Sequence, residues 1–156
     1  MIPVPYVAIR SLDILSGYLQ NLQLVGQDLE SLKQLAQTSR WHQVPDFRKK
    51  LLVERKVILV TNLQQQIVFA SHNLLEMNLY RPADVIGKTP RMFQGAATDP
   101  ETRHRIRTRV AAYEPFQERV TNYKRNGHSY ECVIAGHPVY NIHGEPAHFV
   151  AFEWLA

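Results

Sequence analysis

The chain is poor in cysteine, with a single residue, Cys132, among 156. One cysteine excludes an internal disulfide and fits a protein of the reducing cytoplasm. Long apolar runs are missing too, since none approaches the roughly 20 residues of a membrane-spanning helix. Residues 1–6 lack the basic and long apolar stretches of a secretion signal. The sequence therefore predicts a cytoplasmic protein that does not span a membrane.

Charge of one sign is only slightly in excess. The chain has 18 Lys and Arg against 14 Asp and Glu, a formal net charge of +4. Such a charge can steer an anionic partner, but no nucleic-acid recognition motif accompanies it, so nucleic acid is not an expected partner. The hydrophobic share of 45% is that of a globular chain. This length predicts one domain with some additional secondary structure.

Recognisable catalytic sets are absent from the sequence. There is no serine triad, phosphate-binding loop or pair of carboxylates with catalytic flanks, and no base adjoins Cys132. The seven histidines do not form an evident set of four metal ligands. We therefore expect no enzyme activity and no metal site.

Residues 1–55 form a predicted helical region. A seven-residue repeat of apolar residues runs through it, formed by Leu15, Leu22, Leu29 and Ala36, with Tyr18, Val25 and Leu32 three positions after the first three. This pattern is typical of a coiled coil, but it also fits a helix that covers its own domain. A helix that pairs with a second copy and a helix that only covers the core therefore both remain open. Pro45 interrupts the region, and Asp46 can cap a second helix.

Residues 56–156 alternate between strand and helix patterns. Apolar runs at 57–60 and 67–70 predict two strands, and short helices are expected near 74–80 and 82–87. Thr98 and Glu101 have capping-box spacing for a helix over 99–113. Asn126-Gly127 is a strong hairpin signal between strands at 116–125 and 129–139, and a last strand is expected over 147–154. The order predicts an α+β fold.

A short motif lies between the expected short helices near 74–87 and the helix expected over 99–113. Residues 87–95 read Gly-Lys-Thr-Pro-Arg-Met-Phe-Gln-Gly and precede Thr98-Asp-Pro and an arginine-rich helix. The motif resembles the flavin-contacting segment of light-oxygen-voltage (LOV) domains, a branch of the PAS sensor family. The resemblance covers about residues 56–154. It implies a five-stranded antiparallel sheet with short helices and one longer helix on one face, preceded by N-terminal helices.

The resemblance also implies a cavity and a set of residues for flavin mononucleotide (FMN). Arg91 and Arg107 take the phosphate-holding positions, and a guanidinium suits phosphate because it offers several fixed donors. Gln94 and Asn122 match side chains that bond the edge of the flavin ring. These four residues are the part of the predicted cofactor site that matches the family pattern, and Thr89, Pro90, Glu131 and Glu153 complete the site.

Four positions of that site depart from the family pattern. Pro90 replaces the reactive cysteine, so the light-driven cysteinyl bond is not expected, and Thr89 replaces the asparagine before it. Glu131 and Glu153 stand where the resemblance places an asparagine and the glutamine that senses the flavin state. We expect both glutamates to point into one cavity, with Cys132 on the opposite face of its strand.

The acidic residues leave three interpretations of the cavity open. Glu131 and Glu153 can form an internal ion-pair network with Arg91 and fill a cavity that binds nothing. The cavity can instead hold FMN without the thiol, or another small ligand with a cationic or hydrogen-donating group. Under each interpretation these residues remain the candidate site.

The expected function is a stand-alone sensory or protein-interaction module in signal transduction. It would act without LOV photochemistry and without an output domain of its own, by contact with an unidentified signalling protein. A homodimer through the N-terminal helices, packed on the outer face of the sheet, is the expected assembly. The alternative is an FMN-binding redox or light-responsive protein that forms no adduct.

Overall fold

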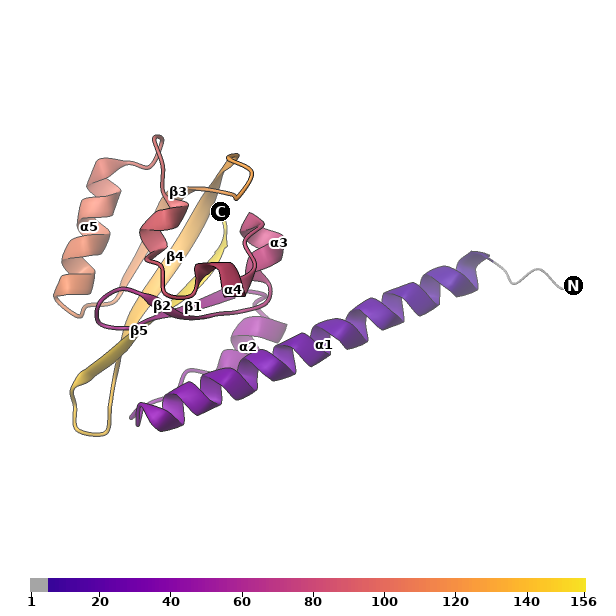
Figure 1. The fold of residues 1–156 in the computed structure, drawn as a ribbon, viewed down its shortest axis with the longest axis horizontal. Coiled ribbons are helices and arrows are strands. Elements are labelled where there is room, and N and C mark those ends of the chain that lie inside the picture. The colour runs from indigo at the N-terminus through magenta and orange to yellow at the C-terminus, as the bar shows by residue number, and fades with distance from the viewer. Residues whose placement is uncertain (1–5) are drawn as a thin grey trace, which may run out of the picture.

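The computed structural model describes residues 6–156, so residues 1–5 of the predicted helical region lie outside the described part. One curved sheet separates two layers of helices (Figure 1). The elements are α1 (Tyr6–Thr38), α2 (Phe47–Leu52), β1 (Val57–Thr61), β2 (Ile67–Ala70), α3 (Leu74–Asn78), α4 (Pro82–Val85), the 3-10 helix η1 (Pro90–Phe93), α5 (Pro100–Ala111), β3 (Phe116–Tyr123), β4 (Ser129–Tyr140) and β5 (Pro146–Leu155).

The five strands form one antiparallel sheet in the order β2-β1-β5-β4-β3. The predicted α+β fold is therefore confirmed. The central strand is β5, in which Glu153 pairs with Val57 of β1 and Ile134 of β4. The β3–β4 turn follows the Asn-Gly signal, because Gly127 has a φ of 87°, which glycine adopts without strain.

The outer face of the sheet is covered by the second half of α1 together with α2. Val25, Leu32 and Ala36 share one buried cluster with outward-facing strand residues such as Ile58 and Phe152. The first half of α1 extends beyond the domain (Figure 1), and there Leu15 and Leu19 are 52% and 56% exposed. The apolar stripe therefore covers the core along part of its length and is free along the rest.

Polar contacts of Asp28 and Trp41 help to fix α1 and the turn after it to the domain. Asp28 of α1 accepts hydrogen bonds from the His72 backbone N–H and lies 2.6 Å from its ring nitrogen Nδ1. Trp41 donates from Nε1 to Nδ1 of His148 on β5, at 3.0 Å.

As predicted, Asp46 caps α2, accepting from the Lys49 N–H. No helix in residues 6–156 has the length and apolarity needed to cross a membrane.

The start of α5 differs from the prediction. Asp99, and not Thr98, is the N-cap, and its carboxylate accepts from the backbone N–H groups of Glu101 and Thr102. The buried Thr98 hydroxyl is engaged elsewhere, because it donates to the carbonyl of Thr121 on β3. A tertiary contact thus determines which of two adjacent cap-forming residues begins the helix.

Candidate functional site

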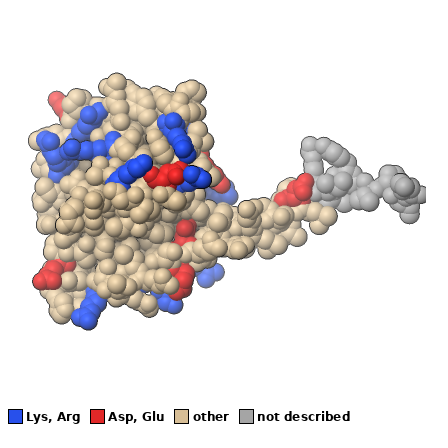
Figure 2. All heavy atoms as spheres, viewed as in Figure 1, with Lys and Arg blue, Asp and Glu red and all other residues tan. Residues whose placement is uncertain are grey.

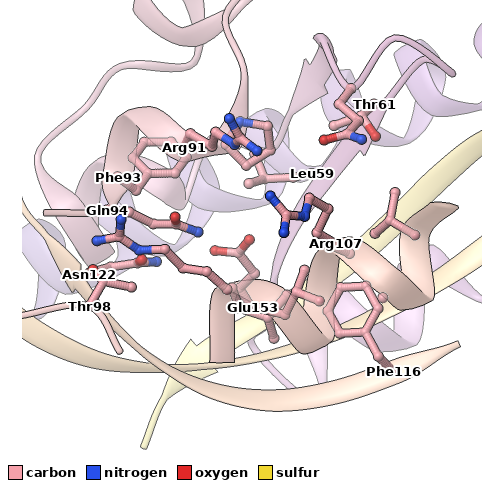
Figure 3. A pocket seen from close by; sticks show the side chains of 18 of the residues that line it. Leu59, Thr61, Arg91, Phe93, Gln94, Thr98, Arg107, Phe116, Asn122 and Glu153 are labelled. Atoms are coloured by element: carbon pink, nitrogen blue, oxygen red, sulfur yellow. The ribbon is translucent and has the colours of Figure 1, made fainter. Parts of the chain in front are cut away.

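A cavity of about 820 Å³ lies between the inner face of the sheet, η1 and α5. Figure 3 shows side chains from all three converging on it. Leu59, Phe93, Ile106, Val110, Phe116 and Ile134 give it apolar walls, and its polar lining includes Arg91, Gln94, Arg103, His104, Arg107, Asn122 and Glu153. Its volume lies in the range of small-molecule sites, roughly 300–1,000 Å³.

Three arginines line the cavity without a carboxylate partner among the described residues. Arg91 comes from η1, and Arg103 and Arg107 are one helical turn apart on α5. By contrast, Arg105 on the other face of α5 forms an ion pair with Glu118 at 2.8 Å. Guanidinium groups that lack an internal counter-ion are available to an anion such as phosphate.

Two amide side chains lie deeper in the cavity. Asn122 on β3 is only 2% exposed, and its Oδ1 is a buried acceptor with no hydrogen-bond donor in the part of the chain that the structure describes. Gln94 follows η1, and Figure 3 shows Gln94, Asn122 and Glu153 around the same part of the cavity. A buried acceptor without a donor is costly, so this corner suits a ligand with an N–H group.

Glu153 points into the cavity from the central strand and is 3% exposed. Its polar contact is weak: the Cys132 thiol donates to Oε2 at 3.7 Å. Burial raises the pKa of Glu153 to about 7, because the charged form loses its hydration. No ion pair joins Glu153 to Arg91 in the described chain. The interpretation in which the acidic residues and Arg91 fill the cavity with an internal ion-pair network therefore does not hold for the described residues, whereas the other two interpretations stay open.

The predicted orientation of Glu131 is wrong as well. Glu131 is exposed on the outer face of β4, where Arg119 lies 3.3 Å away and the Thr121 hydroxyl donates to it. Pairing across the β3–β4 hairpin explains this. Val120 faces inward and pairs with Cys132, whereas Thr121 pairs with Glu131. Cys132 thus faces inward, contrary to the prediction. The residue of β4 that faces the interior is one position later in the chain than Glu131, the residue predicted there.

The remaining predicted positions divide. Pro90 is the first residue of η1. It lines the cavity, and Arg91 and Arg107 line the cavity too. Thr89, just before η1, is exposed and does not line the cavity, although its carbonyl accepts a hydrogen bond from the Met92 N–H. Arg103 was missed. Its position four residues before Arg107 on a helix was the signal that could have identified it.

Glycine at position 136 shapes the cavity wall. A Cβ atom there would lie 2.4 Å from the ring of Phe116 on the neighbouring strand β3. The missing side chain lets that ring lie against the sheet, and both residues line the cavity.

The comparisons with known proteins agree with this fold. A family model described as a PAS domain matches residues 55–153. The blue-light-activated histidine kinase of Brucella canis is 33% identical over 99 residues, which is 62% of this chain and 20% of that protein. Blue-light-activated histidine kinase 1 of Erythrobacter litoralis is 26% identical over 88 residues, 56% of this chain and 24% of that protein. The chain thus spans about a fifth to a quarter of these relatives.

Solved structures show the same fold. The LOV domain from the Erythrobacter litoralis EL346 blue-light activated histidine kinase superposes with a TM-score of 0.61 at 19% identity, covering 64% of this chain and 94% of that one. The light-state dimer of the fungal blue-light photoreceptor Vivid gives 0.60 at 25% identity, covering 64% and 76%.

Proposed function

The chain belongs to the PAS domain family, and we propose that it is a sensory module whose cavity binds FMN without forming a cysteinyl bond to it. The observation that carries the proposal is the cavity itself. Among the described residues, it combines guanidinium groups that lack a carboxylate counter-ion with a buried amide acceptor that lacks a donor. A cavity filled by its own ion pairs would have neither feature.

The residues present fit the parts of FMN one by one. Arg91 and Arg107 are available to the phosphate. The Oδ1 of Asn122 can accept from the ring N–H, and Gln94 can donate to a ring carbonyl. Glu153 is compatible with a carbonyl edge only as the neutral acid, because an ionised carboxylate donates no hydrogen bond. The elevated pKa of Glu153 allows that form.

When bound, FMN supplies absorption of blue light and the capacity to accept electrons. The residues of the chain do not allow a cysteinyl bond to the flavin to follow the absorption of light. Pro90 has no thiol at the start of η1. Cys132 lies inside, but burial raises the pKa of its thiol well above the usual range, so it stays protonated and is a poor nucleophile. We propose that signalling proceeds through hydrogen bonds to the ring.

Absorption spectroscopy of the purified chain tests FMN binding. We expect FMN to acquire a structured blue band when it binds, and the band to persist under illumination because no adduct forms. Arg107→Ala should weaken FMN binding more than riboflavin binding, since riboflavin has no phosphate. Arg105→Ala is the matched control on the same helix and should change neither, because its side chain pairs with Glu118 outside the cavity. A chain that gives no bound-flavin spectrum at saturating FMN would refute the proposal.

We also propose that the first half of α1 joins two copies. It presents an apolar stripe, Leu12, Leu15, Tyr18 and Leu19, to solvent. Asp13 is the only charged residue between Arg10 and Asp28, so little charge opposes association. Figure 2 shows basic and acidic side chains distributed over the domain, whereas the described part of the projecting helix carries few charged groups.

Solution mass tests the dimer. Leu15→Glu with Leu19→Glu should reduce the mass to that of the 18.0 kDa monomer. Ser16→Glu with Gln20→Glu adds the same charge beside the stripe and should leave the dimer intact. A monomeric unmodified chain at high micromolar concentration would contradict this assembly.

A further inference from the structure

Glu153 differs from the other buried carboxylate of the described chain. Asp28, in the outer layer, accepts a backbone N–H and contacts a histidine ring. Among the described residues, the one hydrogen-bond partner of the Glu153 carboxyl is the weak S–H donor of Cys132, so no strong donor there holds it as an anion. The group lies in the middle of the sheet and faces open cavity volume.

The groups around Glu153 do not neutralise it. Cys132 and Tyr130 face the same interior from β4, and burial together with the Glu153 charge raises the pKa of both, so both stay neutral. Neither side chain has a cationic form that could pair with Glu153. The basic groups of the cavity lining come from η1 and α5: Arg91, Arg103, His104 and Arg107. Within the described part of the chain, none of them forms an ion pair with Glu153. These groups are left to a ligand's anionic end.

We infer that Glu153 selects the ligand as a neutral acid, donating a hydrogen bond to a carbonyl-type acceptor on the ring, so that binding takes up one proton whenever the free carboxyl is ionised. This inference rests on the proposed function and deepens it. A glutamine at this position donates at every pH, whereas the glutamate donates only when protonated. The substitution therefore makes ligand binding depend on pH.

The direction of the effect follows from the population of the competent form. Only the protonated fraction binds, so the apparent Kd rises tenfold for each pH unit above the pKa of Glu153. With that pKa at about 7, the affinity for FMN should fall about 30-fold between pH 6 and pH 8.5. A ligand with a cationic or donor group would instead bind more tightly as pH rises.

The test is the Kd of the full chain for FMN from pH 6 to 8.5, beside that of Glu153→Gln. The variant keeps His104, the arginines and the titration of the FMN phosphate, so the ratio of the two Kd values isolates Glu153. We expect the ratio to change about 30-fold, with the variant binding more tightly at pH 8.5. Titration calorimetry of the unmodified chain at pH 8 in two buffers of different ionisation enthalpy should show uptake of about one proton.

The outcomes separate this inference from the proposed function. FMN binding with a constant Kd ratio, or without proton uptake at pH 8, would overturn the role of Glu153 and leave FMN binding standing. Affinity that rises with pH in the unmodified chain relative to Glu153→Gln would overturn it too. Absence of FMN binding by either protein at every pH would refute both. The calorimetry needs no variant, so the role can be refuted even if Glu153→Gln does not fold.

Discussion

The replacement of Glu153 by glutamine should stabilise the ligand-free domain at neutral and alkaline pH but not at acidic pH. The side chain is buried in the central strand, and burial raises its pKa from 4.5 to about 7. Below pH 4.5 the carboxyl is neutral in the folded and unfolded states alike. From pH 4.5 to 7 the unfolded chain releases the proton while the folded chain retains it, so the free energy of unfolding falls. Above pH 7 both states are ionised and the loss is complete.

The magnitude follows from the two pKa values. Their difference of about 2.5 pH units, at 1.36 kcal/mol for each, gives a loss of about 3 kcal/mol. Glutamine has similar size and no charge, so Glu153→Gln avoids this loss. For a chain of this length, 3 kcal/mol corresponds to an increase in Tm of about 6–12 °C. We expect that increase at pH 8 and almost none at pH 4.5.

Urea denaturation of ligand-free protein followed by circular dichroism, at pH 4.5, 6, 7 and 8, measures the effect. Glu131→Gln is the matched control, because the same substitution at an exposed position of β4 removes the ion pair with Arg119 and leaves an amide oxygen that can still accept from the Thr121 hydroxyl. Such pairs contribute about 0–1 kcal/mol, so its effect should be small at every pH. Equal stability of Glu153→Gln and the unmodified chain at pH 8, or a gain at pH 4.5 as large as at pH 8, would refute the reasoning.

Three further substitutions, one of them paired with a control, test the cap of α5, the outer layer and the cavity wall by urea denaturation at pH 7. Asp99→Ala should lose about 1 kcal/mol with the N-cap of α5, and an unchanged stability would contradict that cap. Leu32→Ala should lose about 2–5 kcal/mol because the side chain is 0% exposed on the outer face, whereas the partly exposed Leu75→Ala should lose clearly less. Gly136→Ala should lose about 1–3 kcal/mol through its clash with Phe116, and a neutral result would show that the ring moves away freely.

Local patterns predicted most of the fold. The strand over 67–70 has the predicted bounds, and the Asn-Gly turn lies where the sequence indicates. These features depend on residues close together in the chain, whose propensities and turn chemistry act locally. The extent of the free part of α1 could not be predicted in this way. A repeat of apolar residues marks a helix face, but only the position of the sheet determines where that face is covered.

The candidate site was predictable as a set of residue types and less so as a geometry. Alternation along β4 shows that Cys132 and Glu131 have opposite orientations, but not which of them faces inward. The pairing of β4 with β3 settles that, and a shift of one residue exchanges the two faces. Glu153 points into the cavity as predicted, because it occupies the position on β5 that the LOV resemblance assigns to the cavity glutamine. Whether Arg91 pairs with it depends on the three-dimensional distance between η1 and β5, which local sequence patterns do not determine.

Two adjacent residues of the central strand β5 face opposite sides of the sheet, one toward the cavity and the other toward the outer helices. Glu153 faces the cavity, while the preceding residue, Phe152, packs on the opposite side, its ring 6.3 Å from that of Phe47 and 5.0 Å below the Lys50 ammonium group. A displacement of the backbone at Glu153 therefore also moves Phe152, the residue on which α2 packs. Whatever protonates or engages that carboxyl is mechanically connected to the layer from which the long helix departs.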